Sequence, residues 1–154
     1  MKTAPYMHHF GITISDLDRS VPFYTKYFEL REVLRTPIEG TGISTAVGLP
    51  DVSMTLSFLA GRNTILELLQ YSRPVSCPYG LTNADVGAAH PCFVVDDLQS
   101  LYERMTADGV TFNQRPQVLG WQTLMTYCLD PDGINVELLQ PGPELELDTL
   151  LSRA

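Results

Sequence analysis

Apolar and polar side chains alternate near the N-terminus in a way that predicts a β-strand. Between residues 7 and 14, Phe10, Ile12 and Ile14 fall on one face of such a strand, and His9 falls on the other beside a glycine and a threonine. A helix that packs on this strand would cover the apolar face. His9 is therefore expected to point away from the helix.

A helix is predicted directly after this strand. Asp16 or Asp18 can cap its N-terminus and Pro22 falls in its first turn, so the helix is expected to run from Arg19 to Phe28. Turn signals then separate four short segments that favour extended structure. These predicted strands lie near residues 31–35, 43–48, 54–60 and 64–70.

The second half of the chain repeats this order in a more compact form. A strand over 90–95 is predicted to precede a helix over 98–108, which ends at Gly109 as helices often do. Further strands are expected near residue 112 and over 124–129 and 134–139, with DPDG forming a tight turn between the last two. The tail, residues 142–154, begins with prolines that stop the last strand and ends in a short amphipathic segment, interpreted as a terminal helix.

A histidine begins each copy of a repeated motif. Residues 9–17 read HFGITISDL and residues 90–98 read HPCFVVDDL. Each copy is followed downstream by an apolar strand with one acid in its middle, ILELLQ around Glu67 and NVELLQP around Glu137. Two histidines and two glutamates therefore recur at positions related by the repeat.

These four side chains suit a divalent metal ion. A carboxylate within an apolar strand is costly to bury unless it is paired or binds a metal, and His9 and His90 are the candidate partners. Imidazole and carboxylate ligands suit Zn, Ni, Co, Mn or Fe(II). Taken singly, each histidine could be an ordinary hydrogen-bonded residue and each glutamate a surface residue, but their joint recurrence favours the metal site. His8 falls on the opposite strand face and is interpreted as a bystander.

Composition and charge narrow the class of protein. The 154 residues correspond to about one domain, with no long apolar run that would indicate a signal peptide or a membrane span. Acidic residues outnumber basic ones 18 to 10, giving a formal net charge of −8, so nucleic acid and membranes are not expected partners. The 3 cysteines are widely spaced, which argues against a disulfide framework and fits a reducing cytoplasm.

Over residues 7–141, through the motifs quoted above, the chain resembles the vicinal oxygen chelate superfamily. This superfamily includes glyoxalase I, methylmalonyl-CoA epimerase, extradiol dioxygenases, and fosfomycin and bleomycin resistance proteins. The resemblance implies an α+β fold in which two βαβββ modules form a curved mixed-sheet cleft within a single domain, residues 1–154. Module one would span about 7–72 and module two about 88–141. A homodimer is also implied.

The resemblance also implies a site. One metal ion would be bound by residues from the first and last strands of each module, which here are His9, Glu67, His90 and Glu137. The expected activity is that of a metal-dependent lyase or isomerase that moves a proton next to a carbonyl in a small-molecule substrate, with Glu137 as the first candidate base and Glu67 as the second. The alternatives are an Fe(II)-dependent dioxygenase that uses both histidines and one glutamate, and a drug-binding resistance protein.

At two positions the sequence differs from the members of this superfamily that it would most resemble in function. Thr13 stands where bacterial glyoxalase I typically has an arginine that helps to hold glutathione, and Thr45 stands where some bacterial epimerases carry a base on a strand. Several aromatic and arginine side chains flank the predicted ligand strands and are candidates for lining a substrate cleft. They are Tyr71, Tyr79, Trp121 and Tyr127, with Arg62, Arg73 and Arg115 as possible contacts for a substrate carboxylate or phosphate.

Overall fold

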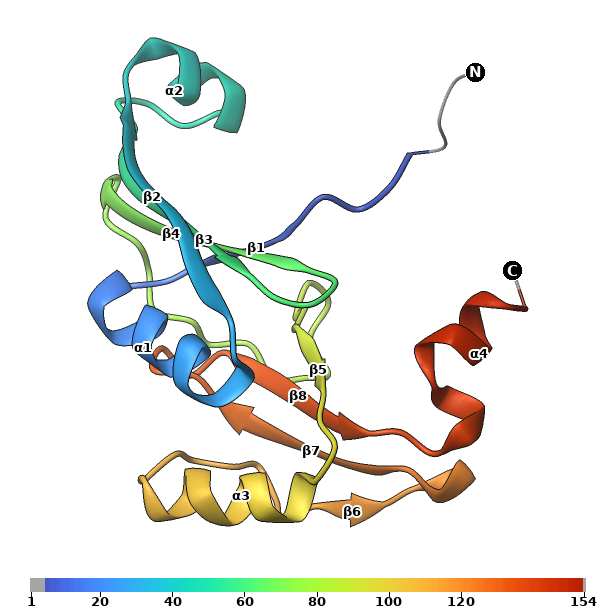
Figure 1. Cartoon of the computed structure of the whole chain (residues 1–154). Coiled ribbons are helices and arrows are strands. Elements are labelled where there is room, and N and C mark those ends of the chain that lie inside the picture. The colour runs from blue at the N-terminus through green and yellow to red at the C-terminus, as the bar shows by residue number, and fades with distance from the viewer. Residues whose placement is uncertain (1–4, 154) are drawn as a thin grey trace. The chain divides into compact units, whose positions relative to one another are not determined.

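The computed structural model describes residues 5–153, and the chain divides into two compact units between Pro78 and Tyr79 (Figure 1). The first unit contains four strands, one long helix and one short helix. In chain order these are β1 (Phe10–Thr13), α1 (Leu17–Phe28), β2 (Arg31–Glu39), α2 (Thr41–Val47), β3 (Ser53–Ala60) and β4 (Ile65–Arg73).

The second unit repeats the strand and helix order of the first. Its elements are β5 (Cys92–Val94), α3 (Leu98–Ala107), β6 (Gln117–Val118), the short 3-10 helix η1 (Gly120–Gln122), β7 (Leu124–Leu129), β8 (Asn135–Gln140), the 3-10 helix η2 (Pro143–Leu145) and α4 (Leu147–Leu151). Helix α4 confirms the short terminal helix that the tail predicts. No helix among residues 5–153 is both long enough and apolar enough to cross a membrane.

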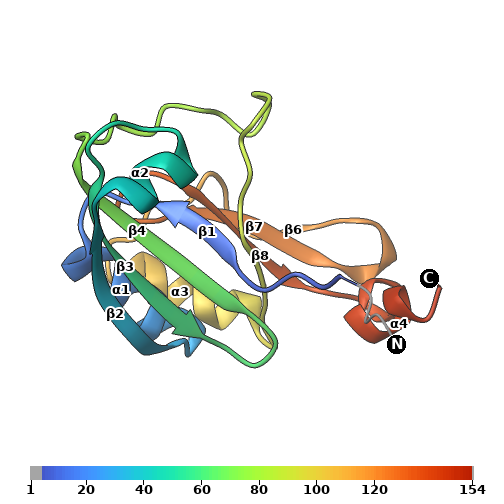
Figure 2. The ribbon, with the colours of Figure 1, turned by 90° about the horizontal axis from the view of Figure 1, so that it is seen from above.

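Each unit has one four-stranded mixed sheet with the same topology (Figure 2). The order is β1-β4-β3-β2 in the first unit and β5-β8-β7-β6 in the second. In both sheets the first and last strands of the unit pair in parallel, and the other neighbours pair in antiparallel fashion. The predicted α+β fold with two βαβββ modules is therefore confirmed, while the single domain that would contain both modules stays a prediction.

The apolar face of each sheet is covered by the helix of its own unit. Leu66 and Leu68 of β4 are almost fully buried on the side where α1 packs. Val136 and Leu138 of β8 are fully buried in the same way beside α3. Because side chains alternate along a strand, the residues between these positions face the other side of the sheet.

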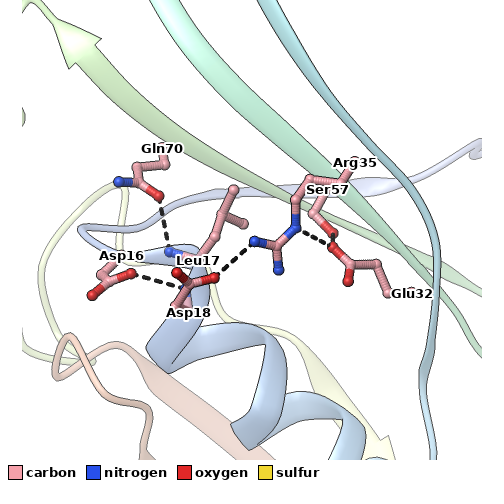
Figure 3. Close-up of polar contacts among 7 residues, drawn as sticks. All are labelled: Asp16, Leu17, Asp18, Glu32, Arg35, Ser57 and Gln70. Atoms are coloured by element: carbon pink, nitrogen blue, oxygen red, sulfur yellow. Dashed lines mark hydrogen bonds and ion pairs between the residues drawn. The ribbon is translucent and has the colours of Figure 1, made fainter.

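A glutamine near the end of each last strand anchors the start of the helix. The Gln70 side-chain oxygen accepts a hydrogen bond from the Leu17 backbone N–H at 3.0 Å (Figure 3). In the second unit Gln140 accepts from the Leu98 N–H, also at 3.0 Å. Asp16, the N-cap of α1, accepts from the N–H two residues later. These bonds satisfy donors that the first turn of a helix leaves free.

Arg35 links the start of α1 to strand β2. Its Nε donates to Glu32 Oε1 at 2.6 Å, and one terminal nitrogen donates to Asp18 Oδ1 at 2.8 Å (Figure 3). The buried Ser57 hydroxyl donates to the same Glu32 oxygen at 2.7 Å. The hydrogen bond from Arg35 lowers the pKa of Glu32, so the carboxylate stays ionised at neutral pH. The network has a structural role, because its bonds join β2 to α1 and to β3.

The predicted strand over 43–48 is wrong, because this segment forms helix α2. Gly48 adopts the left-handed conformation with φ +71°, and the next residue, Leu49, donates its N–H to the Ser44 carbonyl at 3.1 Å. This is a common way for a helix to end at glycine. The β-branched residues of the segment favoured a strand, but the glycine is a helix stop. Thr45 therefore lies on a helix rather than on a strand.

Three smaller differences concern where elements begin. Helix α1 starts at Leu17, so Pro22 lies inside the helix instead of in its first turn, where it lacks the N–H that would bond to the carbonyl four residues earlier. The strand expected near residue 112 is reduced to a single bridge between Phe112 and Cys128, and β6 lies further along the chain. Strands β1 and β5 are shorter than predicted, so both repeat histidines stand just before them.

We predict that Gln140→Ala destabilises the protein by about 1–2 kcal/mol, because the Leu98 N–H at the start of α3 loses its acceptor. Urea denaturation followed by circular dichroism measures this. The control is Gln117→Ala on the exposed strand β6, which should change the free energy of unfolding by no more than about 0.5 kcal/mol. Equal effects of the two substitutions would show that the bond from Gln140 contributes nothing specific.

Candidate metal centre

The first unit brings His9 and Glu67 together. Strands β1 and β4 pair in parallel with Gly11 opposite Glu67, and His9 precedes Gly11 by two residues. The imidazole Nε2 lies 3.2 Å from Oε2 of Glu67. The Glu67 side chain is 14% exposed and the His9 side chain 37% exposed, so the acid is largely shielded from water while the imidazole is more accessible.

The second unit repeats this arrangement with His90 and Glu137. Cys92 of β5 lies opposite Glu137 of β8 in the parallel register, and His90 again precedes its strand. The imidazole Nε2 lies 3.1 Å from Oε2 of Glu137, and the two side chains are 29% and 17% exposed. Each unit therefore pairs one predicted histidine with one predicted glutamate in nearly the same geometry.

Both glutamates lie on the sheet face opposite the core. In β4 the neighbours of Glu67 on either side, Leu66 and Leu68, point into the core, and Val136 and Leu138 do the same around Glu137. A carboxylate shielded from water needs compensation by a donor, a cation or a metal ion. The nearby imidazole supplies a donor at each site, and a metal ion could take the place of its proton.

The donor chemistry of the two pairs fits a divalent metal ion. Neutral imidazole nitrogen and carboxylate oxygen are ligands that zinc and neighbouring transition metals accept. Each pair presents one imidazole and one carboxylate. Within residues 5–153, no three His, Cys, Asp or Glu side chains gather closely enough to hold a metal ion. Each pair is therefore a half-site of two potential ligands.

Tyr127 is a third member of the second half-site. It lies opposite Glu137 in the antiparallel pairing of β7 and β8. Its hydroxyl donates to Glu137 Oε2 at 3.2 Å and lies 3.3 Å from His90 Nε2, and its ring meets the imidazole edge to face. Burial and then the negative charge of Glu137 raise the pKa of Tyr127 to about 12. The hydroxyl therefore keeps its proton at neutral pH and acts as a donor.

The first half-site has Phe58 where the second has Tyr127. Phe58 lies opposite Glu67 in the pairing of β3 and β4, and its ring centroid is 5.7 Å from that of His9. The aromatic ring thus recurs beside the imidazole, but without a hydroxyl. Gly11 also differs from its counterpart, Cys92: a Cβ atom at position 11 would come within 3.2 Å of Glu67 Oε2, so the glycine leaves room for the carboxylate.

His8 is not the bystander that the sequence predicts. It precedes β1, so strand alternation does not hold it on the opposite face, and its Nδ1 lies 2.8 Å from Nδ1 of His9. This contact fixes the orientation of the His9 ring, whose Nε2 faces Glu67. In the second half-site, Nδ1 of His90 is buried and finds no hydrogen-bond partner among the residues that the structure describes.

Of the candidate cleft residues, Tyr127 is the one that the structure brings into direct contact with predicted ligands. Trp121 is 66% exposed at the tip before β7. Arg73 bonds Asp51 through Nε at 3.0 Å, in a surface ion pair. The hydrogen bond from Tyr127 had a signal in the sequence, because the tight DPDG turn fixes which residue of β7 lies opposite Glu137.

Comparisons with known proteins identify relatives over most of the chain. The lactoylglutathione lyase of Haemophilus influenzae is 30% identical over 139 residues, which cover 86% of this chain and 90% of that protein. A lactoylglutathione lyase of Arabidopsis thaliana is 28% identical over 141 residues, covering 90% of this chain and 45% of the plant protein. The chain thus spans about half the length of this plant relative.

Solved structures of glyoxalase family proteins are also similar to this chain, and a family model matches most of it. A glyoxalase family protein from Bacillus cereus superposes with a TM-score of 0.73 at 19% identity, covering 92% of this chain and 97% of the other. The trypanothione-dependent glyoxalase I of Leishmania major superposes with a TM-score of 0.65 at 25% identity, covering 97% and 92%. Residues 6–138 match the family pattern itself. The chain belongs to the Glyoxalase/Bleomycin resistance protein/Dioxygenase superfamily.

Proposed function

We propose that this protein is a metal-dependent lyase of the glyoxalase type, in which His9, Glu67, His90 and Glu137 together bind one divalent metal ion. The observation that carries the proposal is the pair of matched contacts, at 3.2 Å in the first unit and 3.1 Å in the second. Relatives named lactoylglutathione lyase support the lyase class. The site would be completed within one chain or between the two chains of a homodimer. The homodimer also stays a prediction.

In this proposal each histidine binds through Nε2, the atom that already faces a carboxylate in its unit. When bound, the metal ion supplies positive charge that stabilises the charge developing on a carbonyl oxygen as the neighbouring carbon loses a proton. A glutamate carboxylate removes that proton and returns it. Glu137 is the first candidate for this base and Glu67 the second.

The substrate is proposed to be a thiol adduct of a short oxo compound. This follows from the name that the relatives share, since lactoylglutathione joins a lactoyl group to a thiol. Thr13, on β1 beside Leu69, occupies the position where bacterial glyoxalase I typically has an arginine that helps to hold glutathione. Threonine carries no positive charge for a glutathione carboxylate, so a thiol other than glutathione belongs in the first set of substrates tested.

We predict that Glu137→Gln abolishes proton exchange at the carbon next to the carbonyl, because an amide cannot act as a base. Lactoylglutathione and related thioesters are incubated with the protein in D₂O, and deuterium incorporation is followed by NMR. Glu103→Gln, on the exposed face of α3, is the control and should exchange like the wild type. Full exchange by Glu137→Gln with its metal retained would exclude Glu137 as the base and leave Glu67 as the candidate.

We further predict that removing the metal ion abolishes exchange and that adding back one divalent metal restores it. The protein is dialysed against a chelator, its metal content is measured, and Zn, Ni, Co, Mn or Fe(II) is then added. Restoration by iron alone, with consumption of oxygen, would favour the dioxygenase alternative. Unchanged exchange in protein shown to be free of metal would contradict the proposed function.

A further inference from the structure

The two half-sites are alike in backbone register, and the aromatic rings beside their histidines differ in one hydroxyl group. Tyr127 and Phe58 each lie opposite the glutamate of their unit, on the strand next to the last one. Each ring also lies beside the histidine, with centroid distances of 5.1 Å to His90 and 5.7 Å to His9. The tyrosine oxygen is therefore the chemical difference between two otherwise equivalent positions.

This oxygen contacts both members of its half-site. It lies 3.2 Å from Glu137 Oε2 and 3.3 Å from His90 Nε2, while those two atoms are 3.1 Å apart. A carboxylate oxygen can accept two hydrogen bonds, so Glu137 can accept from the hydroxyl and from the imidazole at once. The three groups form a closed triangle that restricts the rotation of the glutamate and the imidazole.

We propose that Tyr127 is a positioning residue that preorganises the second half-site for metal binding, so that His90 and Glu137 hold the ion more firmly than His9 and Glu67 do. The inference rests on the proposed function for the metal ion. It goes beyond that function by making the two half-sites unequal and by assigning the difference to a residue that is not itself a ligand.

The inequality follows from what remains after an ion displaces the imidazole proton. Glu137 would lose its bond from His90 Nε2 but keep the hydrogen bond from the Tyr127 hydroxyl. Glu67 would lose its contact with His9, and none of the other side chains described in residues 5–153 bonds it. A carboxylate that is already held costs less entropy to order when it becomes a ligand. Residues that hydrogen-bond ligands typically change metal affinity by about 10–100-fold when they are replaced.

The test compares the affinity of the whole chain for Zn²⁺ in the wild type, Tyr127→Phe and Tyr102→Phe. Affinity is measured by competition with a chromophoric chelator, which requires no substrate. Tyr127→Phe is expected to weaken binding by about 10–100-fold. Tyr102 lies on α3, and its ring packs on Phe112. Tyr102→Phe also removes one hydroxyl and should bind Zn²⁺ as tightly as the wild type.

A general structural role is separated from positioning by urea denaturation of the metal-free proteins. Where Tyr127→Phe is folded, an affinity equal to that of the wild type would overturn the inference. Phe58→Tyr adds the hydroxyl to the first half-site and is expected to tighten Zn²⁺ binding. If Tyr127→Phe does not fold, this variant decides alone, and unchanged or weaker binding would overturn the inference.

The failures of the two proposals have different signatures. Wild-type protein that binds no divalent metal would overturn both. Metal-dependent proton exchange in the wild type together with unchanged Zn²⁺ affinity in Tyr127→Phe would leave the proposed function standing and remove only the role of Tyr127. Equal losses of affinity in His9→Ala and His90→Ala would also contradict the inequality of the half-sites.

Discussion

The parallel pairing of the first and last strands of each unit is the constraint on which the candidate site depends. It places Gly11 opposite Glu67 and Cys92 opposite Glu137, and so brings the histidine ahead of each first strand next to the acid of the last. Parallel neighbours cannot be joined by a tight turn, and the intervening helix and strands of each unit supply the connection. The helix buries one face of the sheet, which leaves the glutamate to the other.

The repeat also shows which features the fold needs and which the site needs. Gln70 and Gln140 have the same structural role in the two units, because each accepts a hydrogen bond from the first N–H of its helix. At the half-sites, by contrast, the units have diverged: Tyr127 replaces Phe58, and only the first unit has a neighbouring histidine that bonds the candidate ligand. The histidine–glutamate contact itself is kept in both, as expected if both pairs serve one metal ion.

Most of the architecture could be predicted from the sequence, because alternation and helical spacing report directly on which face is buried. Both His–Glu pairs followed from the repeat. The segment over 43–48 could not be assigned from β-branched residues alone, since the left-handed Gly48 that ends α2 outweighs their preference for strands. The contact of His8 with His9 was missed because strand alternation was extended beyond the first residue of β1. Tyr127 was named only as a cleft residue, although the turn before β8 fixed its register.

The central claim is that two half-sites, one in each unit, bind a single metal ion together. Native mass spectrometry of the wild type, His9→Ala and His90→Ala, each titrated with Zn²⁺ to a small molar excess, tests this most directly, because it counts ions per chain. We expect one ion per chain in the wild type and a loss of occupancy when either histidine is replaced. Two ions per chain, or full occupancy after removal of His9 or His90, would show that the pairs do not share one ion.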